Sequence, residues 1–179
     1  MTPRRLSLLI LVVLLLGLPS PSPPLSQPTP LRTRELHAVF SSTNPGGIVT
    51  DVIIDISDGP AGAEAVIEVS RYRPTCANNG CPQVLHHAFN RVPLEPGSLQ
   101  ISGELEAVTV RGSGRVRQPL VPGVGTVALE LTWTGVGRVA RDEHEEGELF
   151  RRATAAGALR AGSTNFTPQA SIDAHIEEW

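Results

Sequence analysis

Lysine is absent from this 179-residue chain, and all 15 of its basic residues are arginines. A phosphate-binding P-loop, a Schiff base and a lysine general base each require a lysine, so these three kinds of site are excluded. The chain carries 18 acidic residues and a formal net charge of -3, and its basic residues form no run longer than a pair. It therefore lacks the concentrated positive charge with which proteins bind nucleic acids, and we expect no nucleic-acid partner.

Cysteine and aromatic residues are also scarce. Two cysteines are too few for a disulfide-dense scaffold or for a zinc site built from four thiolates. Glycine and proline are abundant, with 17 and 16 residues, whereas Phe, Trp and Tyr together number seven. This composition favours a turn-rich β protein over a helical bundle.

The N-terminus predicts export. Two arginines, Arg4 and Arg5, precede the apolar run Leu6–Leu18, which has the length of a signal-peptide core. A spanning helix needs about 20 apolar residues, so the run is short for a permanent anchor, although an uncleaved N-terminal anchor stays open as the alternative. We therefore expect a signal peptide at 1–26, a Pro-rich disordered leader at 27–34 and one antiparallel β domain at 35–179, secreted to the cell envelope or the extracellular space and without a membrane span after cleavage.

The remaining sequence alternates apolar and polar residues in short runs separated by turns, which is typical of antiparallel sheets. The clearest run is 126–134, in which Val127, Leu129, Leu131 and Trp133 share one face. Because a shift by one residue would bury Glu130, the register of this strand is fixed. We predict an all-β, single-domain antiparallel β-sandwich or closed β-barrel of about eight to ten strands. The expected strands are 36–42, 49–57, 63–72, 83–91, 98–111, 126–134 and 170–177.

Two stretches do not fit a simple strand. In 98–111 the apolar residues change parity, which predicts a bulge or a bend at Gly103 or at 106–107, followed by a turn or a kink at 112–114. The segment 150–161, FRRATAAGALRA, fits a helix by propensity and a strand by alternation. The residues alone leave this second choice open.

Cys76 and Cys81 lie between two predicted strands, with Asn79 and Gly80 supplying a turn between them. In an exported protein this spacing favours a disulfide at the tip of a hairpin. Free thiols or a metal site remain the alternatives. A metal site would need help from His86 or His87, and adjacent strand residues point to opposite faces, so only one of the two could take part.

Five carboxylates gather within seven residues at 142–148. Such an oxygen-rich loop offers ligands to Ca²⁺, but the spacing is not that of an EF-hand, and a solvated loop is the favoured interpretation. The weak metal candidates are Asp142, Glu143, Glu145, Glu146 and Glu148.

No catalytic constellation is recognisable. The chain has no G-x-S-x-G elbow and no G-x-G-x-x-G fingerprint, so we assign no catalytic residue and no cofactor. A pocket that gathered His86 or His87 with His144 and several acids would indicate an acid–base enzyme. Trp133 follows the inward parity of its strand, which favours the core over a sugar-binding face. Asn165-Phe166-Thr167 is a glycosylation sequon that we expect to be unused in a bacterium, the source indicated by the all-arginine, Ala/Gly/Pro-rich composition.

Three stretches resemble an uncharacterised family of secreted bacterial β-rich proteins. They are AVFSSTNPGGIVTDV at 38–52, LTWTGVG at 131–137, and TNFTP at 164–168 with ASIDA at 170–174. The resemblance implies a signal peptide, a β-rich body and a strand at 150–161, and it brings no assigned activity. Gly46-Gly47 stands where similar proteins often have Gly-Cys, so the family's cysteine pairing does not carry over directly.

We therefore expect a secreted or cell-surface binding module without enzymatic activity, for a small apolar ligand, a carbohydrate or a protein. The alternatives are an enzyme with scattered His and carboxylate chemistry, and a self-associating structural component of the envelope. Whether the β interior is hollow or packed decides whether a ligand fits inside.

Overall fold

The computed structural model describes residues 32–74, 82–141 and 148–179, and this part of the chain contains eleven β-strands and no helix. All strand pairs are antiparallel. The strands are β1 (Arg34–Thr43), β2 (Val49–Gly59), β3 (Gly62–Arg73), β4 (Gln83–Leu94), β5 (Leu99–Ser102), β6 (Ala107–Arg115), β7 (Thr126–Gly135), β8 (Ala140–Arg141), β9 (Leu149–Ala161), β10 (Thr164–Asn165) and β11 (Asp173–Glu178). The predicted all-β class is confirmed, and the count exceeds ten because β8 and β10 are strands of only two residues.

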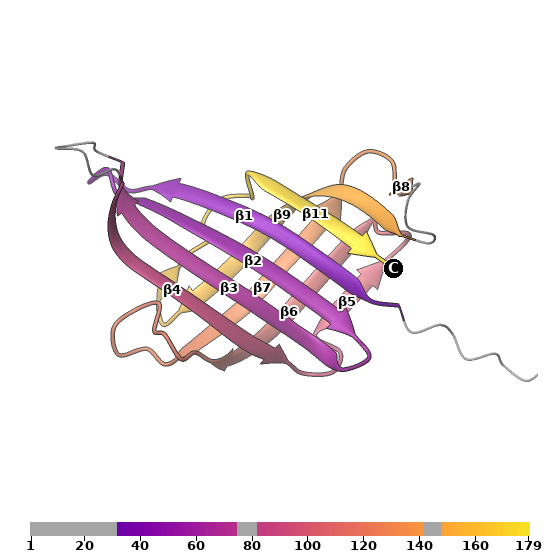
Figure 1. The fold of residues 1–179 in the computed structure, drawn as a ribbon, viewed down its shortest axis with the longest axis horizontal. Coiled ribbons are helices and arrows are strands. Elements are labelled where there is room, and N and C mark those ends of the chain that lie inside the picture. Colours follow the sequence, from indigo (N-terminus) through magenta and orange to yellow (C-terminus); the bar gives the residue numbers. More distant parts are fainter. Residues whose placement is uncertain (1–31, 75–81, 142–147) are drawn as a thin grey trace, which may run out of the picture. The chain divides into compact units, whose positions relative to one another are not determined.

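The strands form one continuous sheet that does not close on itself. Their order is β4-β3-β2-β1-β11-β9-β7-β6-β5, and β8 and β10 both pair with β9. The sheet folds over into two layers: β4, β3, β2, β1 and β11 lie in front of β9, β7, β6 and β5, which cross behind them (Figure 1). Of the two expected architectures, the structure therefore has the sandwich-like one.

β9 is the strand that joins the layers. Its first residues, Leu149–Arg152, pair with β11 in the first layer, and from Ala153 onward it pairs with β7 in the second. Gly157 makes the close approach to β7 possible, because it has a φ of 134° and a Cβ there would lie 2.2 Å from the main-chain oxygen of Glu130. The segment 150–161 is thus a strand, as the resemblance implied.

The region expected as one bent strand, 98–111, is instead the hairpin β5–β6. Leu99 lies opposite Val110, and the chain reverses through Gly103 and Leu105, which have φ values of 59° and 52°. The parity change therefore reflects two strands joined by a tight turn. Of the turn or kink expected at 112–114, the turn is wrong, because β6 continues as a strand to Arg115.

Glycines in β6 let the free edge of the first layer approach the second. A Cβ on Gly112 would lie 2.7 Å from Leu94 Cδ2, and one on Gly114 would lie 2.4 Å from Val92 Cγ1. Gln118 then covers the edge of β4: its side-chain oxygen accepts a hydrogen bond from the amide of Phe89 at 2.8 Å, and its main chain forms two bonds of 2.9 Å with the buried side chain of Asn90. These contacts protect an edge that would otherwise be open to pairing with another chain.

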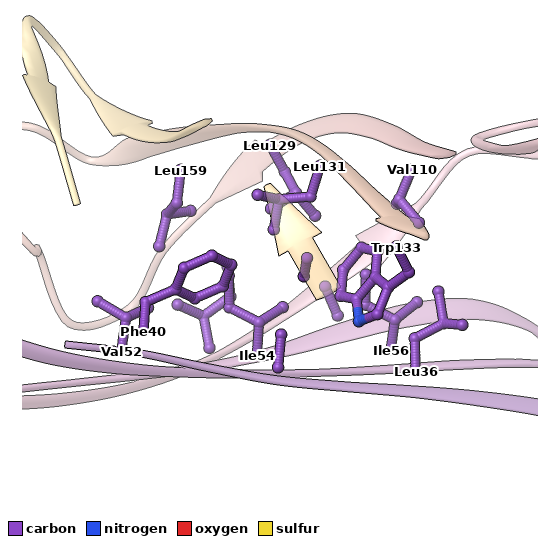
Figure 2. Packing of buried hydrophobic residues seen from close by; sticks show 14 of the residues in the cluster. Leu36, Phe40, Val52, Ile54, Ile56, Val110, Leu129, Leu131, Trp133 and Leu159 are labelled. Atoms are coloured by element: carbon purple, nitrogen blue, oxygen red, sulfur yellow. The ribbon is translucent and has the colours of Figure 1, made fainter. Parts of the chain in front are cut away.

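The interior is filled by apolar side chains from both layers. Figure 2 shows Leu36, Phe40 and Ile54 of the first layer facing Leu129, Leu131 and Trp133 of the second. The predicted inward face of 126–134 is confirmed, since Leu131 and Trp133 are fully buried. Full burial of such a side chain contributes about 1.5–3 kcal/mol to folding. The space between the layers is therefore a packed core.

The two ends of the described unit are held together. The main chains of Thr33 and Trp179 exchange two hydrogen bonds, of 2.9 and 3.0 Å. Beside them the buried carboxylate of Glu178 accepts hydrogen bonds from Arg32 and, at 2.7 Å, from Arg34 Nε. Burial by itself would raise the pKa of Glu178, but the hydrogen bonds and charges of the two arginines outweigh it, so the pKa lies below its usual value.

Candidate functional site

The outer face of the first layer carries a row of polar side chains in register. Asp55 of β2 lies opposite His37 of β1, which in turn lies opposite His175 of β11, and His175 lies opposite Arg152 of β9. These positions alternate with the buried residues of their strands, so all four side chains point away from the core. The fold thus gathers, on one surface, residues that are up to 138 positions apart in the sequence.

Two rings of this row, His37 and His175, lie beside the ring of Phe150 on β9, and we call these three residues the ring platform. The rings of His37 and His175 stack with centroids 4.9 Å apart and planes at 21°, and Phe150 is tilted against His175 at 5.3 Å. The two imidazoles keep 27% and 29% of their side-chain surface exposed. The platform is therefore accessible to a ligand while being fixed by its own contacts.

A carboxylate lies near each imidazole of the platform. Nδ1 of His37 lies 2.6 Å from Oδ1 of Asp55, and Nε2 of His175 lies 3.6 Å from Oε1 of Glu177. A carboxylate at Nδ1 fixes the orientation of the ring and favours a proton on that nitrogen. The Asp55–His37 pair is thus the arrangement from which a histidine can act as an acid, a base or a hydrogen-bonding partner.

A cleft of about 510 Å³ adjoins the platform, within the size range of small-ligand sites. It forms where β9 turns away from β11 into the second layer, and Ser171 bridges the gap through hydrogen bonds of 2.8 Å with the main chain of Ala155. Arg152 and Asp173 line it, and neither forms an ion pair with any residue that the structure describes. The cleft therefore offers one positive and one negative group that have no ion-pair partner within 32–74, 82–141 and 148–179.

Ile172 also lines this cleft and is 69% exposed. The expected strand 170–177 begins only at Asp173, so Ile172 lies outside the sheet and does not reach the core. The apolar side chain of Ile172 thus lines the same cleft as the charged side chains of Arg152 and Asp173. The cleft combines the apolar and polar contacts that a specific ligand site uses.

A second polar cluster lies on the same face. The carboxylate of Asp51 accepts hydrogen bonds from Ser41 Oγ at 2.6 Å and from the hydroxyl of Tyr72 at 2.9 Å. The hydrogen bond to Asp51, followed by burial and by the charge of Asp51, raises the pKa of Tyr72. The tyrosine therefore stays protonated, and the cluster serves to hold three neighbouring strands together.

The histidines whose gathering would indicate an acid–base enzyme are only partly described. His86 and His87 point to opposite faces, as adjacent strand residues must, and Nδ1 of His87 lies 3.0 Å from Ser70 Oγ and 3.8 Å from Glu68 Oε1. Nε2 of His86 is buried and has no hydrogen-bond partner among the described residues. His144 lies outside the described residues, so the structure does not test whether it joins His86 or His87.

Most of the other predicted site residues lie outside the described part of the chain, so these predictions are not tested. Cys76 and Cys81 lie outside the described residues, as do Asp142, Glu143, Glu145 and Glu146; Glu148 precedes β9 and is half-buried. Within 32–74, 82–141 and 148–179, no group of three or more His, Cys, Asp or Glu side chains is arranged to hold a metal ion. In the sequon, Asn165 accepts a hydrogen bond from the amide of the buried Thr167 at 3.2 Å.

His37, Asp55, His175 and Arg152 are not among the site residues that the sequence predicts. The pairing of His37 with Asp55 could have been found, because counting outward from the turn at 43–49 places them opposite each other. No local signal predicts that His37 lies opposite His175, because β1 and β11 are the first and the last strand in the order of the sequence.

No protein-family model, no curated protein and no solved structure matches the chain. In the described part of the chain there is also no helix of the length and apolarity that a bilayer crossing requires.

Proposed function

We propose that this protein is a secreted or cell-surface binding module without enzymatic activity, and that it binds a carbohydrate at the ring platform and the adjoining cleft. The single observation that carries the proposal is the exposed stack of His37, His175 and Phe150 beside the charged side chains of Arg152 and Asp173. Sugar rings bind by placing their C–H faces on flat rings and their hydroxyl groups on charged side chains. Membership in the secreted bacterial β-rich family is part of the same proposal.

The packed interior favours an external ligand over a small apolar molecule between the layers. Trp133, Leu131 and Ile54 fill the space that a hollow β-barrel would offer to such a molecule. The outer face of the first layer, in contrast, is rich in hydrogen-bonding groups. A polar ligand is therefore the better match.

The proposal is tested by titrating the purified full-length chain, exported by its host, with a panel of neutral and acidic oligosaccharides in a calorimeter. Phe150→Ala and His175→Ala should each weaken binding about tenfold, because each removes a ring contact worth about 1–1.5 kcal/mol. Phe89→Ala is the matched control, since Phe89 is 42% exposed on the outer face of β4, at the far edge of the same sheet. Absence of binding across the panel, or equal loss in the control, would contradict the proposal.

A second candidate is an enzyme that uses His37 and Asp55 for acid–base chemistry, and the 2.6 Å contact between them favours it. The His37 ring is stacked against His175, however. In addition, no serine or cysteine of the described residues forms a hydrogen bond with either histidine of the platform. An enzyme of this kind would convert a bound oligosaccharide over time. Asp55→Asn would abolish that conversion while leaving binding in place, whereas a binding module would show no conversion at all.

A further inference from the structure

The outer face of the second layer contains a shallow basic depression. Two adjoining hollows, of about 410 and 230 Å³, share Ala128 of β7 and Arg160 of β9 as lining residues. In the sheet register Ser113 lies opposite Ala128, and Ala128 lies opposite Arg160. Because Ala128, Ser113 and the neighbouring Ala158 have small side chains, the surface is low at its centre and the arginines stand around it.

Three arginines surround this depression, and two of them have no ion-pair partner in the part of the chain that the structure describes. Arg111 forms an ion pair with Glu130 at 3.0 Å, and both side chains are about two-thirds exposed. Arg115 and Arg160 form no ion pair with any residue in the described ranges. Glu130 is the one carboxylate among the residues that line the two hollows. The depression therefore has an excess of positive charge.

This excess is unusual for the molecule. The whole chain is acidic, with a net charge of -3, and the outer face of the first layer carries more carboxylates than arginines. Unpaired arginines that converge on a concave surface raise the local concentration of anions, and a guanidinium binds phosphate or sulfate through paired N–H donors. The arrangement of charge thus points to an anionic ligand.

The geometry favours a repeating anion over a single one. Arg111 and Arg115 are four residues apart on β6, which corresponds to about 13 Å along an extended strand. Arg160 lies on β9, two strands from β6 and about 10 Å across the sheet. Its register position corresponds to Ser113, which is midway between Arg111 and Arg115 on β6. A chain with anionic groups at intervals of about 10 Å could reach all three guanidinium groups at once.

The surroundings distinguish among the anionic polymers. No aromatic side chain lines either hollow, so the bases of a single-stranded nucleic acid would have nothing to stack on. None of the exposed large apolar residues of the described chain projects from the outer faces of β6, β7 or the second part of β9, so the face has nothing to insert into a bilayer. A soluble sugar polymer requires neither feature.

We propose that the depression around Ala128 binds a sulfated or phosphorylated polysaccharide through Arg115, Arg160 and, after it leaves Glu130, Arg111. This site lies on the opposite layer from the ring platform and does not depend on the proposed function. It would hold the protein to an anionic matrix while the other face remains free.

The test is binding of the purified full-length chain to dextran sulfate, with neutral dextran of equal length as the control polymer. We expect binding to dextran sulfate alone, weakening steadily with added salt. Arg115→Gln and Arg160→Gln should each reduce the affinity about tenfold, the loss expected for a charge-assisted hydrogen bond. Arg91→Gln is the matched control, because Arg91 is an exposed arginine of the first layer paired with Glu64, and it should bind as the wild type does.

A measurement on the unmodified protein makes the test independent of variant folding. In an NMR titration with dextran sulfate, the amide signals of Ala128 and Ala158 should shift, whereas those of His37 and His175 should not. The proposal is overturned by failure to bind dextran sulfate at low salt, by an equal loss in Arg91→Gln, or by shifts confined to the first layer. Single-stranded DNA or anionic vesicles that bind equally well through the same arginines would overturn the assignment to a sugar polymer.

Discussion

The indole Nε1 of Trp133 donates a hydrogen bond to the main-chain oxygen of His37, 2.8 Å away. Trp133 is fully buried on β7, and His37 is one of the three residues of the ring platform on the opposite layer. The bond therefore ties the second layer to the strand that positions the candidate site. The buried side chain of Trp133 thus also holds the main chain of His37 beneath the platform.

Replacing this indole tests the link. Trp133→Phe keeps an aromatic ring but removes the indole N–H donor. The main-chain oxygen of His37 then loses this hydrogen bond, and the smaller ring leaves a small cavity. We expect a loss of about 2–3 kcal/mol in the free energy of unfolding, measured with urea. Trp179→Phe is the control: Trp179 is 45% exposed, and its replacement should change stability by less than about 0.5 kcal/mol. Equal effects of the two substitutions would contradict this account.

The ion pairs that Glu178 forms with Arg32 and Arg34 predict that the stability of the fold depends on pH. The pKa of Glu178 is lower in the folded state than in the unfolded chain, so the contribution is present above the ordinary carboxyl pKa. It is lost as the pH falls through the lowered pKa of the folded state. Glu178→Gln should therefore destabilise the protein at neutral pH, and the gap from the wild type should close in acid.

Urea unfolding at a series of pH values from 7 to about 3 measures this gap. Arg34→Gln should cost more than Arg32→Gln, because Arg34 is 24% exposed and Arg32 is 51% exposed, and solvent screens the more exposed pair. Glu130→Gln is a control, since Glu130 and its partner Arg111 are both largely exposed. A gap that stays constant with pH would show that the carboxylate charge of Glu178 is not what stabilises the fold.

Gln118 should protect the edge of β4 from exchange with solvent. Its side-chain oxygen is the acceptor for the amide of Phe89, so Gln118→Ala leaves that amide to water. Hydrogen exchange followed by NMR should show the Phe89 amide exchanging about ten times faster, which corresponds to the loss of one hydrogen bond of about 1–1.5 kcal/mol. The amide of Val127, in the central strand β7, should be unchanged. Acceleration at both positions would indicate a general loss of stability instead of a local one.

The sequence predicted the parts of the fold in which one face of a strand is buried. In 126–134 any other register would bury Glu130, so the alternation determines which residues form the core. The turn between β5 and β6 gave no comparable signal, because it places Leu105, a leucine, at positive φ and in the core, where turn rules expect Gly, Asn or Asp. The hairpin was therefore interpreted as one bent strand.

The candidate sites were harder to predict because they depend on pairings between distant segments. The ring platform exists because β11 pairs with β1, and the basic depression exists because β9 pairs with β7. Neither pairing can be counted from a turn, since each joins strands separated by other strands in the sequence. His175 and Arg160 thus appear in the sequence as isolated polar residues, and only the sheet order gives them neighbours.

Substitutions at Gly157 and Gly123 separate the cost of a steric clash from the cost of an unfavourable backbone conformation. The φ of 134° at Gly157 is unfavourable for any other residue, and a Cβ there would also lie 2.2 Å from the main-chain oxygen of Glu130. Gly123 shares the first property, with a φ of 79°, but a Cβ on Gly123 would meet nothing within 4 Å. Gly123→Ala should therefore cost about 1 kcal/mol, the penalty of the conformation alone, whereas Gly157→Ala should cost about 3 kcal/mol or more, since the main chain of β7 would have to move. Urea unfolding of both variants gives the difference directly. Because β9 meets β7 at Gly157, the larger loss should be accompanied by weaker polysaccharide binding at Arg160, and equal losses in the two variants would show that the two strands are not in close contact there.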